Sequence, residues 1–405
     1  MRRRPASFSS LALALAFMLG GVGRTAAQQG QGQVVKLGEG ETLTISGFVN
    51  ASLFLNRGSF LGSFGNGQNA EWAALAQPGV SQGIFDGDVR NTRINFTFAA
   101  GPVIGKWAPK ATIEADFFGA FAGSGGPPFG DEQPQFRDRF AFVDLSDGRT
   151  TLRIGQFWSP MFGEVPVSLT HIAFPLGYGA TGMVGWRYPG VFLYHDLTSG
   201  KGMTAQLQVA VFKGSGADVG GGIGSGEASA RPQFETRLNA ARKFSNVSWN
   251  GYAVYHVDWK NLNAPGVPTN DVTDWGFETG HNFVVSSLTL HGNFYYGKGL
   301  GQQFAHISQT QPQIRGWGAW AQAGYDFNPH WSFWMYYGMD QPDYGRFRTE
   351  TGATLARQLN HDSDALVRFR AGRYAVGLEY FRAVTRWSTA IQSADQYALS
   401  VLYTL

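Results

Sequence analysis

The last twelve residues of the chain, Ala394–Leu405, read ADQYALSVLYTL. Apolar side chains occupy every second position of this stretch, at Tyr397, Leu399, Val401, Tyr403 and Leu405. A period of two indicates a β-strand with one apolar face. This strand is the last one in the sequence. The fold that it belongs to depends on how many similar strands precede it.

Sixteen segments of this kind can be placed along the chain. They are 42–54, 88–100, 109–120, 136–145, 150–158, 190–197, 203–213, 234–244, 248–259, 275–284, 287–297, 316–327, 331–339, 364–371, 373–383 and 395–405. Each has about the length of a tilted transmembrane strand, and an even count is usual in closed bacterial barrels. The sequence therefore predicts an all-β fold, a 16-stranded antiparallel transmembrane β-barrel, with eighteen strands as the alternative count.

The connections between these segments alternate in length. Long connections such as 55–87 and 159–189 follow odd-numbered segments, whereas tight ones such as 146–149 and 328–330 follow even-numbered segments. This alternation is typical of barrels with short periplasmic turns and long external loops. A soluble β-sandwich or propeller does not predict it.

Charged residues alternate with apolar ones inside the segments. In 109–120, the residues Ile113, Ala115 and Phe117 alternate with Thr112, Glu114 and Asp116. Charges at membrane depth are tolerated on the water-filled side of a barrel wall, so we expect the charged face to line a lumen.

The N-terminus has the features of an export signal. Basic residues at 2–4 precede an apolar stretch at 11–19 and a small-residue cleavage site at 25–27. The apolar stretch is too short to cross a bilayer. We therefore expect 1–27 to be a cleaved signal peptide, 28–41 a short periplasmic segment and 42–405 the barrel, located in the cell outer membrane.

Composition excludes several other classes of protein. Cleavage would remove Arg2, Arg3, Arg4 and Arg24, so the 32 Lys and Arg fall by four to 28, against 29 Asp and Glu. The basic pI therefore gives no reason to expect a nucleic-acid partner. The absence of cysteine excludes a disulfide scaffold and Cys-based zinc sites. The 55 glycines and the 15% of aromatic residues suit tight turns and interfacial rings.

The third long connection, 159–189, is rich in apolar residues for an external loop. Its polar or titratable candidates are Glu164, His171, Tyr178 and Arg187. We expect it to fold into the barrel, pack against the wall and narrow the lumen. The alternative is that it covers the barrel mouth or contacts a neighbouring subunit.

Two stretches resemble a known family. The run DRFAFVDLSDGRTTLRIGQFWSPMFGE (138–164) resembles the corresponding region of Gram-negative porins, and RIGQFW with the later WRYPGVFLYH (186–195) resembles the DcaP-like porins. Two features depart from that pattern: the short segment before the barrel, and Leu405 in place of the more common terminal Phe. The resemblance implies a homotrimer that allows passive diffusion of small hydrophilic solutes.

Alternation along the strands, together with Glu164 and Arg187 of the third connection, gives the predicted residues of the pore and its constriction. They are Arg93, Glu114, Asp116, Arg137, Arg139, Arg153, Glu164, Arg187, Arg237, Arg368 and Arg370. Arginines on the wall, opposed by acids that include Glu164 on the loop, would impose a transverse field and a mild anion preference. The alternative is that the arginines pair with neighbouring acids and only keep the wall hydrated. A β-bulge would reverse the facing of such positions.

Other functions remain open at this point. A sugar- or anion-selective channel needs a specifically lined lumen, and a structural barrel predicts no conductance. A barrel enzyme needs a nucleophile and a base, for which His195-Asp196 and His361-Asp362 offer only part. No cofactor or metal is expected, because the glycines of 177–182 lack the flanking strand and helix of a dinucleotide site and the histidines are scattered. Expected partners are outer-membrane lipid, lipopolysaccharide and the barrel-assembly machinery, which would engage the C-terminal strand.

Overall fold

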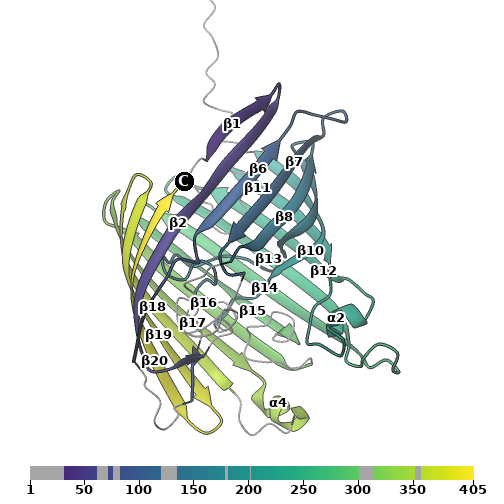
Figure 1. The fold of residues 1–405 in the computed structure, drawn as a ribbon, viewed down its shortest axis with the longest axis vertical. Helices are drawn as coiled ribbons and strands as arrows, with labels where there is room; N and C mark the ends of the chain where they lie inside the picture. The colour runs from purple at the N-terminus through teal and green to yellow at the C-terminus, as the bar shows by residue number, and fades with distance from the viewer. Residues whose placement is uncertain are drawn as a thin grey trace, which may run out of the picture.

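The computed structural model describes residues 32–61, 72–75, 83–119, 135–177, 181–200, 202–300, 313–351 and 357–405. Most of them belong to one antiparallel sheet that closes on itself (Figure 1). The last strand, β20 (Ile391–Thr404), pairs with β2 (Glu41–Arg57) and closes the barrel. The alternating C-terminal stretch therefore closes the wall.

The wall strands follow one another in chain order. After β2 they are β5 (Gly83–Asp88) with β6 (Arg93–Ala99), β7 (Ala108–Asp116), β8 (Arg137–Ser146), β9 (Thr150–Trp158), β10 (Arg187–Gly200), β11 (Met203–Phe212), β12 (Gln233–Lys243), β13 (Val247–Asn261), β14 (Asp271–Val285), β15 (Leu288–Lys298), β16 (Arg315–Asp326), β17 (Trp331–Pro342), β18 (Arg357–Ala371), β19 (Tyr374–Trp387) and β20. Both β5 and β6 pair with β2, one beyond the other, so they form one interrupted wall strand. The closed barrel has sixteen wall positions, which confirms the prediction.

Among the described residues, the sheet contains eighteen strands because β5 and β6 are separate and β1 (Gln33–Gly38) is added. β1 pairs with the first residues of β2, and the two form a hairpin that projects beyond the barrel end where the chain terminates (Figure 1). The sequence showed no pattern there, because all six side chains of β1 are exposed and no alternation marks the strand. The expected signal peptide, 1–27, lies outside the described residues.

The two faces of the wall differ in chemistry. On β20 the side chains of Tyr397, Leu399 and Tyr403 are 45%, 43% and 50% exposed, whereas Gln396 and Ser400 on the other face are buried. Exposed aromatic residues gather beside the short turns, at Phe244, Phe283, Tyr325, Phe327, Trp331, Tyr374 and Tyr403. An outer apolar face with aromatic residues near one rim is what lipid contact and a membrane interface require.

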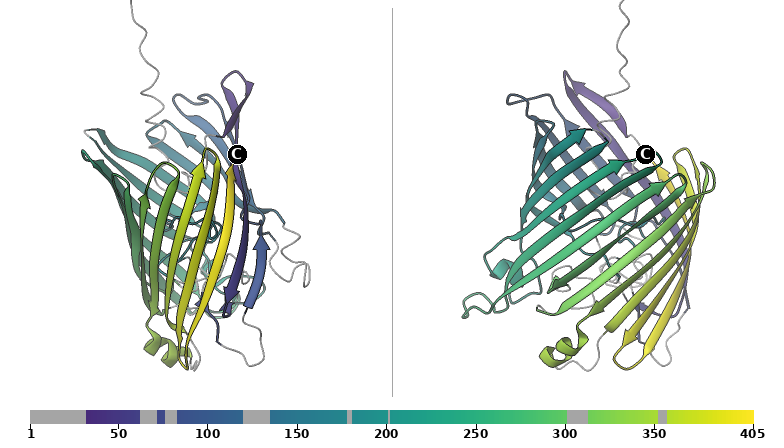
Figure 2. Two further views of the ribbon diagram at one scale, coloured as in Figure 1. Left: turned by 90° about the vertical axis from the view of Figure 1, so that its left-hand side faces the viewer. Right: turned by 180° about the vertical axis from the view of Figure 1, so that it is seen from behind.

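Several strands extend further than predicted, mostly at the end that carries the long loops (Figure 2). β18 begins at Arg357 rather than 364, and β14 begins at Asp271 rather than 275. The added residues are mostly polar. Apolar alternation marks the part of a strand that faces lipid, so it stops before the strand does.

The long loops carry a few small elements. The helices α2 (Ser225–Ala228) and α4 (Tyr344–Thr351) lie in two of them, and β3 (Phe60–Leu61) pairs with β4 (Trp72–Ala73) in the first. Over the part of the chain that the structure describes, no helix is both long and apolar enough to cross a membrane.

Candidate functional site

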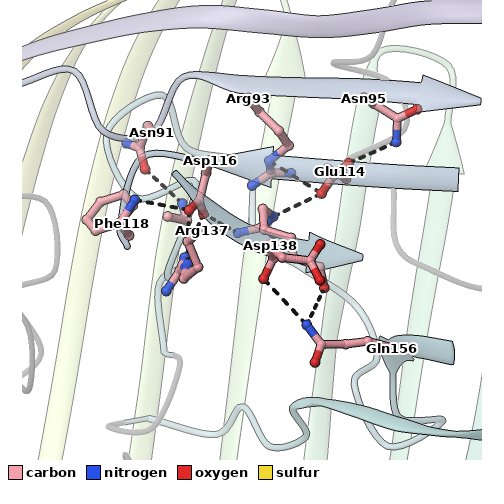
Figure 3. Close-up of polar contacts among 11 residues, drawn as sticks. Asn91, Arg93, Asn95, Glu114, Asp116, Phe118, Arg137, Asp138 and Gln156 are labelled. Atoms are coloured by element: carbon pink, nitrogen blue, oxygen red, sulfur yellow. Dashed lines mark hydrogen bonds and ion pairs between the residues drawn. The ribbon is translucent and has the colours of Figure 1, made fainter. Parts of the chain in front are cut away.

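Arginines and carboxylates form a network on the inner faces of β6, β7 and β8 (Figure 3). Arg139 donates from Nε to Glu114 Oε1 at 2.9 Å and from Nη1 to Asp116 Oδ2 at 2.8 Å. Arg137 binds both oxygens of Asp116, at 2.9 and 2.6 Å. Arg93 Nε lies 3.7 Å from Glu114 Oε1. The structure thus brings five of the predicted pore residues together as ion pairs.

A β-bulge determines which side chains of β8 join this network. Glu114 pairs with Phe140, but the next residue, Ala115, pairs with Asp138, so Arg139 is the extra residue of the bulge. If the side chains alternated strictly back along the strand from the inward-facing Phe142, Arg139 would face the outside of the barrel. The bulge instead places Arg139 and Arg137 on the inner side, which is the facing that the sequence predicted without anticipating the bulge.

Arg153, on β9, is held by the neighbouring strand and by aromatic rings. It binds both oxygens of Asp144, at 2.7 and 2.9 Å. Its Cζ lies 3.7 Å from the ring centroid of Phe142 and 4.0 Å from that of Phe157. A guanidinium that is stacked and bidentate is fixed in position, so Arg153 contributes a static charge to the wall.

The remaining predicted arginines lie elsewhere. Arg237, on β12, donates to the carbonyl oxygens of Pro160 and Phe162 in the third loop, at 2.9 and 3.3 Å. Arg187 belongs to β10 rather than to the loop, and its guanidinium lies over the rings of Trp158 and Trp186.

Two more arginines lie toward the short-turn end of β18. Arg368 donates to Ser332 Oγ at 3.2 Å, and Arg370 pairs with Asp326 at 3.2 Å with 42% of its side chain exposed. Both are near the turn at Gly372, so the structure separates them from the network on β6–β8.

The third loop, 159–186, packs against inward-facing side chains of strands that are far apart around the wall. Glu235 of β12 accepts a hydrogen bond from the Met161 amide at 2.7 Å. Glu379 of β19 accepts bonds from the Leu169 and Thr170 amides at 3.2 and 3.0 Å. These partners belong to the buried polar face of the wall. The described part of the loop therefore contacts the polar face of strands on different sides of the wall.

The interruption between β5 and β6 takes part in this packing. Asn91 lies in the gap, donates to the Thr170 carbonyl at 2.8 Å and accepts from the Ala173 amide at 3.0 Å. On the adjacent strand, Asn50 donates to the Leu169 carbonyl at 3.1 Å. Breaking the wall strand here leaves the Asn91 amide to form two hydrogen bonds with the loop backbone.

A row of polar residues on four neighbouring strands forms hydrogen bonds with the middle of the loop. Asn250, Asn282, His291 and Gln322 are successive cross-strand partners on β13, β14, β15 and β16. Gln322 Oε1 accepts from the Val167 amide at 2.7 Å, and its Nε2 donates to the Val167 carbonyl at 2.8 Å. We call these four residues the amide row.

Glu164 contacts the other end of the amide row. Its carboxylate accepts from Asn250 and Asn282, each at 3.4 Å, and lies 3.5 Å from His291 Nδ1. Burial raises the pKa of the Glu164 carboxyl, but His291, Asn282 and Arg237 outweigh burial and hold that pKa below its usual range. Glu164 is thus bound on the side of β13–β15.

A second group of acids lies on β17, β18 and β19, away from the arginine network. Asp340 accepts from the Tyr295 hydroxyl at 2.8 Å, and Asp362 accepts from Thr181 Oγ1 at 3.2 Å. Asp364 and Glu379 are buried on the same side. Hydroxyls and amides are prominent among the contacts of these acids, in contrast to the guanidinium groups around Glu114 and Asp116.

Some of these residues were not predicted as site residues. Asn50, Asn91 and the three amide side chains of the amide row carry no charge, and candidates were selected from the sequence by charge. A usable signal existed: Asn282 and His291 stand four residues on either side of the short turn at Ser286 and Ser287. Residues at equal height above a turn become neighbours. Tyr178 lies outside the described residues.

The structure also places the residues considered for catalysis or metal binding. His361 contacts the exposed Tyr337, whereas the adjacent Asp362 is buried on the inner face. His195 contacts Thr150. In the described ranges, no group of three or more His, Cys, Asp or Glu is arranged to hold a metal ion.

Neither a protein-family model nor a curated protein matches the sequence. Solved structures do match. The outer membrane channel DcaP of Acinetobacter baumannii superimposes with a TM-score of 0.69 at 16% identity, covering 92% of this chain and 99% of that one. OmpF of Salmonella typhi, in complex with daunomycin, gives a TM-score of 0.57 at 12% identity, covering 92% and 100%. The anion-selective porin of Comamonas acidovorans gives 0.54 at 11% identity, covering 90% and 100%. The chain therefore has the sixteen-stranded porin fold.

Proposed function

We propose that this chain forms a water-filled channel in the outer membrane through which small hydrophilic solutes diffuse passively. The observation that carries the proposal is the division of the closed wall into an apolar outer face and an inner face with the ion pairs of β6–β9. Charged groups at this depth require water, and a closed barrel leaves its inside as the place for it.

We further propose that the third loop sets the size limit of the channel. Its contacts with Glu235, Gln322 and Glu379 hold its backbone against the inner wall. In this arrangement Arg93, Glu114, Asp116, Arg137, Arg139 and Arg153 contribute to the wall charge of the narrow region. Glu164 and Arg237 act as loop anchors, and Arg368 and Arg370 act closer to the short-turn rim.

A mild anion preference stays a prediction. The network arginines favour it, and one structure with the same fold is named an anion-selective porin. The pairing of those arginines with Glu114, Asp116 and Asp144 reduces their net charge, and the acids of β17–β19 oppose it. A substrate-selective channel is the second candidate, favoured by the separation of arginines and acids on different strands, which would orient a dipolar solute.

The proposal includes the surroundings of the channel. We infer a cleaved signal at 1–27, a periplasmic segment at 28–41, insertion by the barrel-assembly machinery through β20, and a homotrimer in contact with outer-membrane lipid and lipopolysaccharide. The apolar outer face supports contact with lipid.

Planar-bilayer recording of the purified, folded protein under a salt gradient tests the proposal. We expect stepwise openings in groups of three, and the sign of the reversal potential gives the charge preference. Folded, inserted protein that never conducts would exclude the channel and favour a structural barrel or an enzyme. Single openings would contradict the trimer alone.

A further inference from the structure

We propose that His291 makes the attachment of the third loop depend on pH, so that the loop is held most firmly when the imidazole carries both protons. This rests on the proposed channel function, because the loop matters through the pore that it narrows. The switch depends on the hydrogen bonds of the amide row, which consists of Asn250, Asn282, His291 and Gln322.

Val167 fixes the orientation of the Gln322 amide. The Val167 N–H donates to Oε1 and the Val167 carbonyl accepts from Nε2, so the oxygen and the nitrogen of this amide cannot be exchanged without losing both bonds. His291 Nε2 lies 2.8 Å from the same Oε1. Because Oε1 is an acceptor, His291 must carry a proton on Nε2.

The other imidazole nitrogen also faces an acceptor. His291 Nδ1 is buried without a hydrogen-bond partner in the described residues, and Glu164 Oε2 lies 3.5 Å from it. A proton on Nδ1 gives an imidazolium beside a carboxylate. Without that proton, a lone pair faces a buried negative charge. The doubly protonated ring therefore satisfies both acceptors, Gln322 Oε1 and Glu164 Oε2. The neutral ring leaves the buried Glu164 carboxylate facing a lone pair, which is unfavourable.

The surroundings of the ring limit other ways to relieve this strain. Trp320 and Trp334 stand edge-on to the imidazole, with ring centroids 5.2 and 6.1 Å away, and His291 is 7% exposed. The charged groups near the contact are Glu164 on the loop, Arg237 on β12 and Glu278 on β14, and Arg368 on β18 lies beyond Trp334. Glu278 accepts from Asn293, two residues from His291, and from Tyr252, whose hydroxyl accepts from the Glu164 amide. Asn282 and Asn250 are neutral, so they cannot replace the imidazolium charge.

The consequence follows from histidine chemistry. Imidazole groups change charge in the neutral pH range, roughly pH 5 to 8. When the ring loses its Nδ1 proton at higher pH, the loop loses its charge-assisted contact at Glu164, while the backbone bonds of Val167, Leu169 and Thr170 persist. We therefore expect loosening of the loop around Glu164 rather than its release.

Single-channel recording tests this at about pH 6 and about pH 8.5. In the wild type we expect current fluctuations within the open state to be about tenfold more frequent at the higher pH, which corresponds to about 1.4 kcal/mol. His291→Gln removes the titration but keeps a polar side chain, so its fluctuation frequency should not change with pH. Glu164→Gln should behave in the same way. His281→Gln on the neighbouring strand is the matched control and should behave as the wild type does.

Two results would overturn the switch: a pH dependence that persists in His291→Gln, or a wild type with equal fluctuations at both pH values. A wild type that does not conduct would instead refute the channel itself. Should His291→Gln fail to fold, His291→Asn offers a second test with the same expectation.

Discussion

The arginine network on β6–β8 and the amide row on β13–β16 are built differently on the same inner wall. In the network, charged side chains bind each other, and Arg139 bridges Glu114 and Asp116. In the amide row, mostly neutral side chains bind the loop backbone, and Gln322 forms a two-bond pair with Val167. The comparison shows that ion pairs join neighbouring strands of the wall, whereas the loop is held by hydrogen bonds to its backbone, from the amides of the row and from Glu235, Glu379 and Arg237.

The largest expected effect comes from breaking the network at Arg139. Arg139→Leu leaves Glu114 and Asp116 buried with one fewer cation between them. Loss of one partner from a buried ion pair costs about 3–5 kcal/mol of unfolding free energy. Urea unfolding of the folded barrel, followed by tryptophan fluorescence, measures the loss.

The control for this experiment is Arg370→Ala. Arg370 forms an ion pair with Asp326 whose partners are 42% and 44% exposed, so its removal should cost less than about 1 kcal/mol. Equal stability losses in the two variants would contradict the view that the network fixes the wall.

The next largest effect comes from the amide row. Gln322→Ala removes both bonds to Val167, worth about 2 kcal/mol together. The loop should then move away from the wall more often, and the barrel should stay folded. Liposome swelling with sugars of increasing size should show faster entry of the largest sugars.

Gln341→Ala is the matched control for Gln322→Ala, because Gln341 lies exposed on β17. An unchanged size limit in Gln322→Ala would show that the amide row does not hold the constriction.

The sequence predicted the wall well for a physical reason. Lipid on one side and water on the other impose a period of two on each strand, so the positions of sixteen wall strands could be found from alternation. The hairpin of β1 and the polar outer ends of β14 and β18 lie beyond that influence. Their sequences carry no apolar period, and they were missed.

The candidate site was predicted less completely. The inward arginines of β6–β9 were found because charge at membrane depth is unusual. The bulge at Arg139 was not found, because the extra residue changes the pairing register without a distinctive residue type. Contacts between Glu164 and His291, or Val167 and Gln322, join distant parts of the chain. They depend on where the loop lies, which local sequence patterns do not specify.

A smaller effect, on the reversal potential, is expected from variants on the two charged sides of the wall. Arg93→Gln removes a cation next to Glu114, and Asp362→Asn removes an anion on β18. The first variant should shift the reversal potential toward cation preference and the second toward anion preference, each by a few millivolts. Shifts of the same sign would show that the two sides do not act on permeating ions as opposite charges.

The smallest effect concerns Glu164 at acidic pH. The folded protein holds the pKa of this carboxyl below its usual range. Its contribution to loop attachment is therefore present above the pKa of the free side chain and is lost as pH falls through the lower, folded value. Open-state current fluctuations should rise as the pH is lowered toward about 3, below the range where glutamate ordinarily titrates. Glu164→Gln should have frequent fluctuations at every pH and no rise at the acidic end. A rise that survives in Glu164→Gln would assign the acid sensitivity to carboxylates other than Glu164.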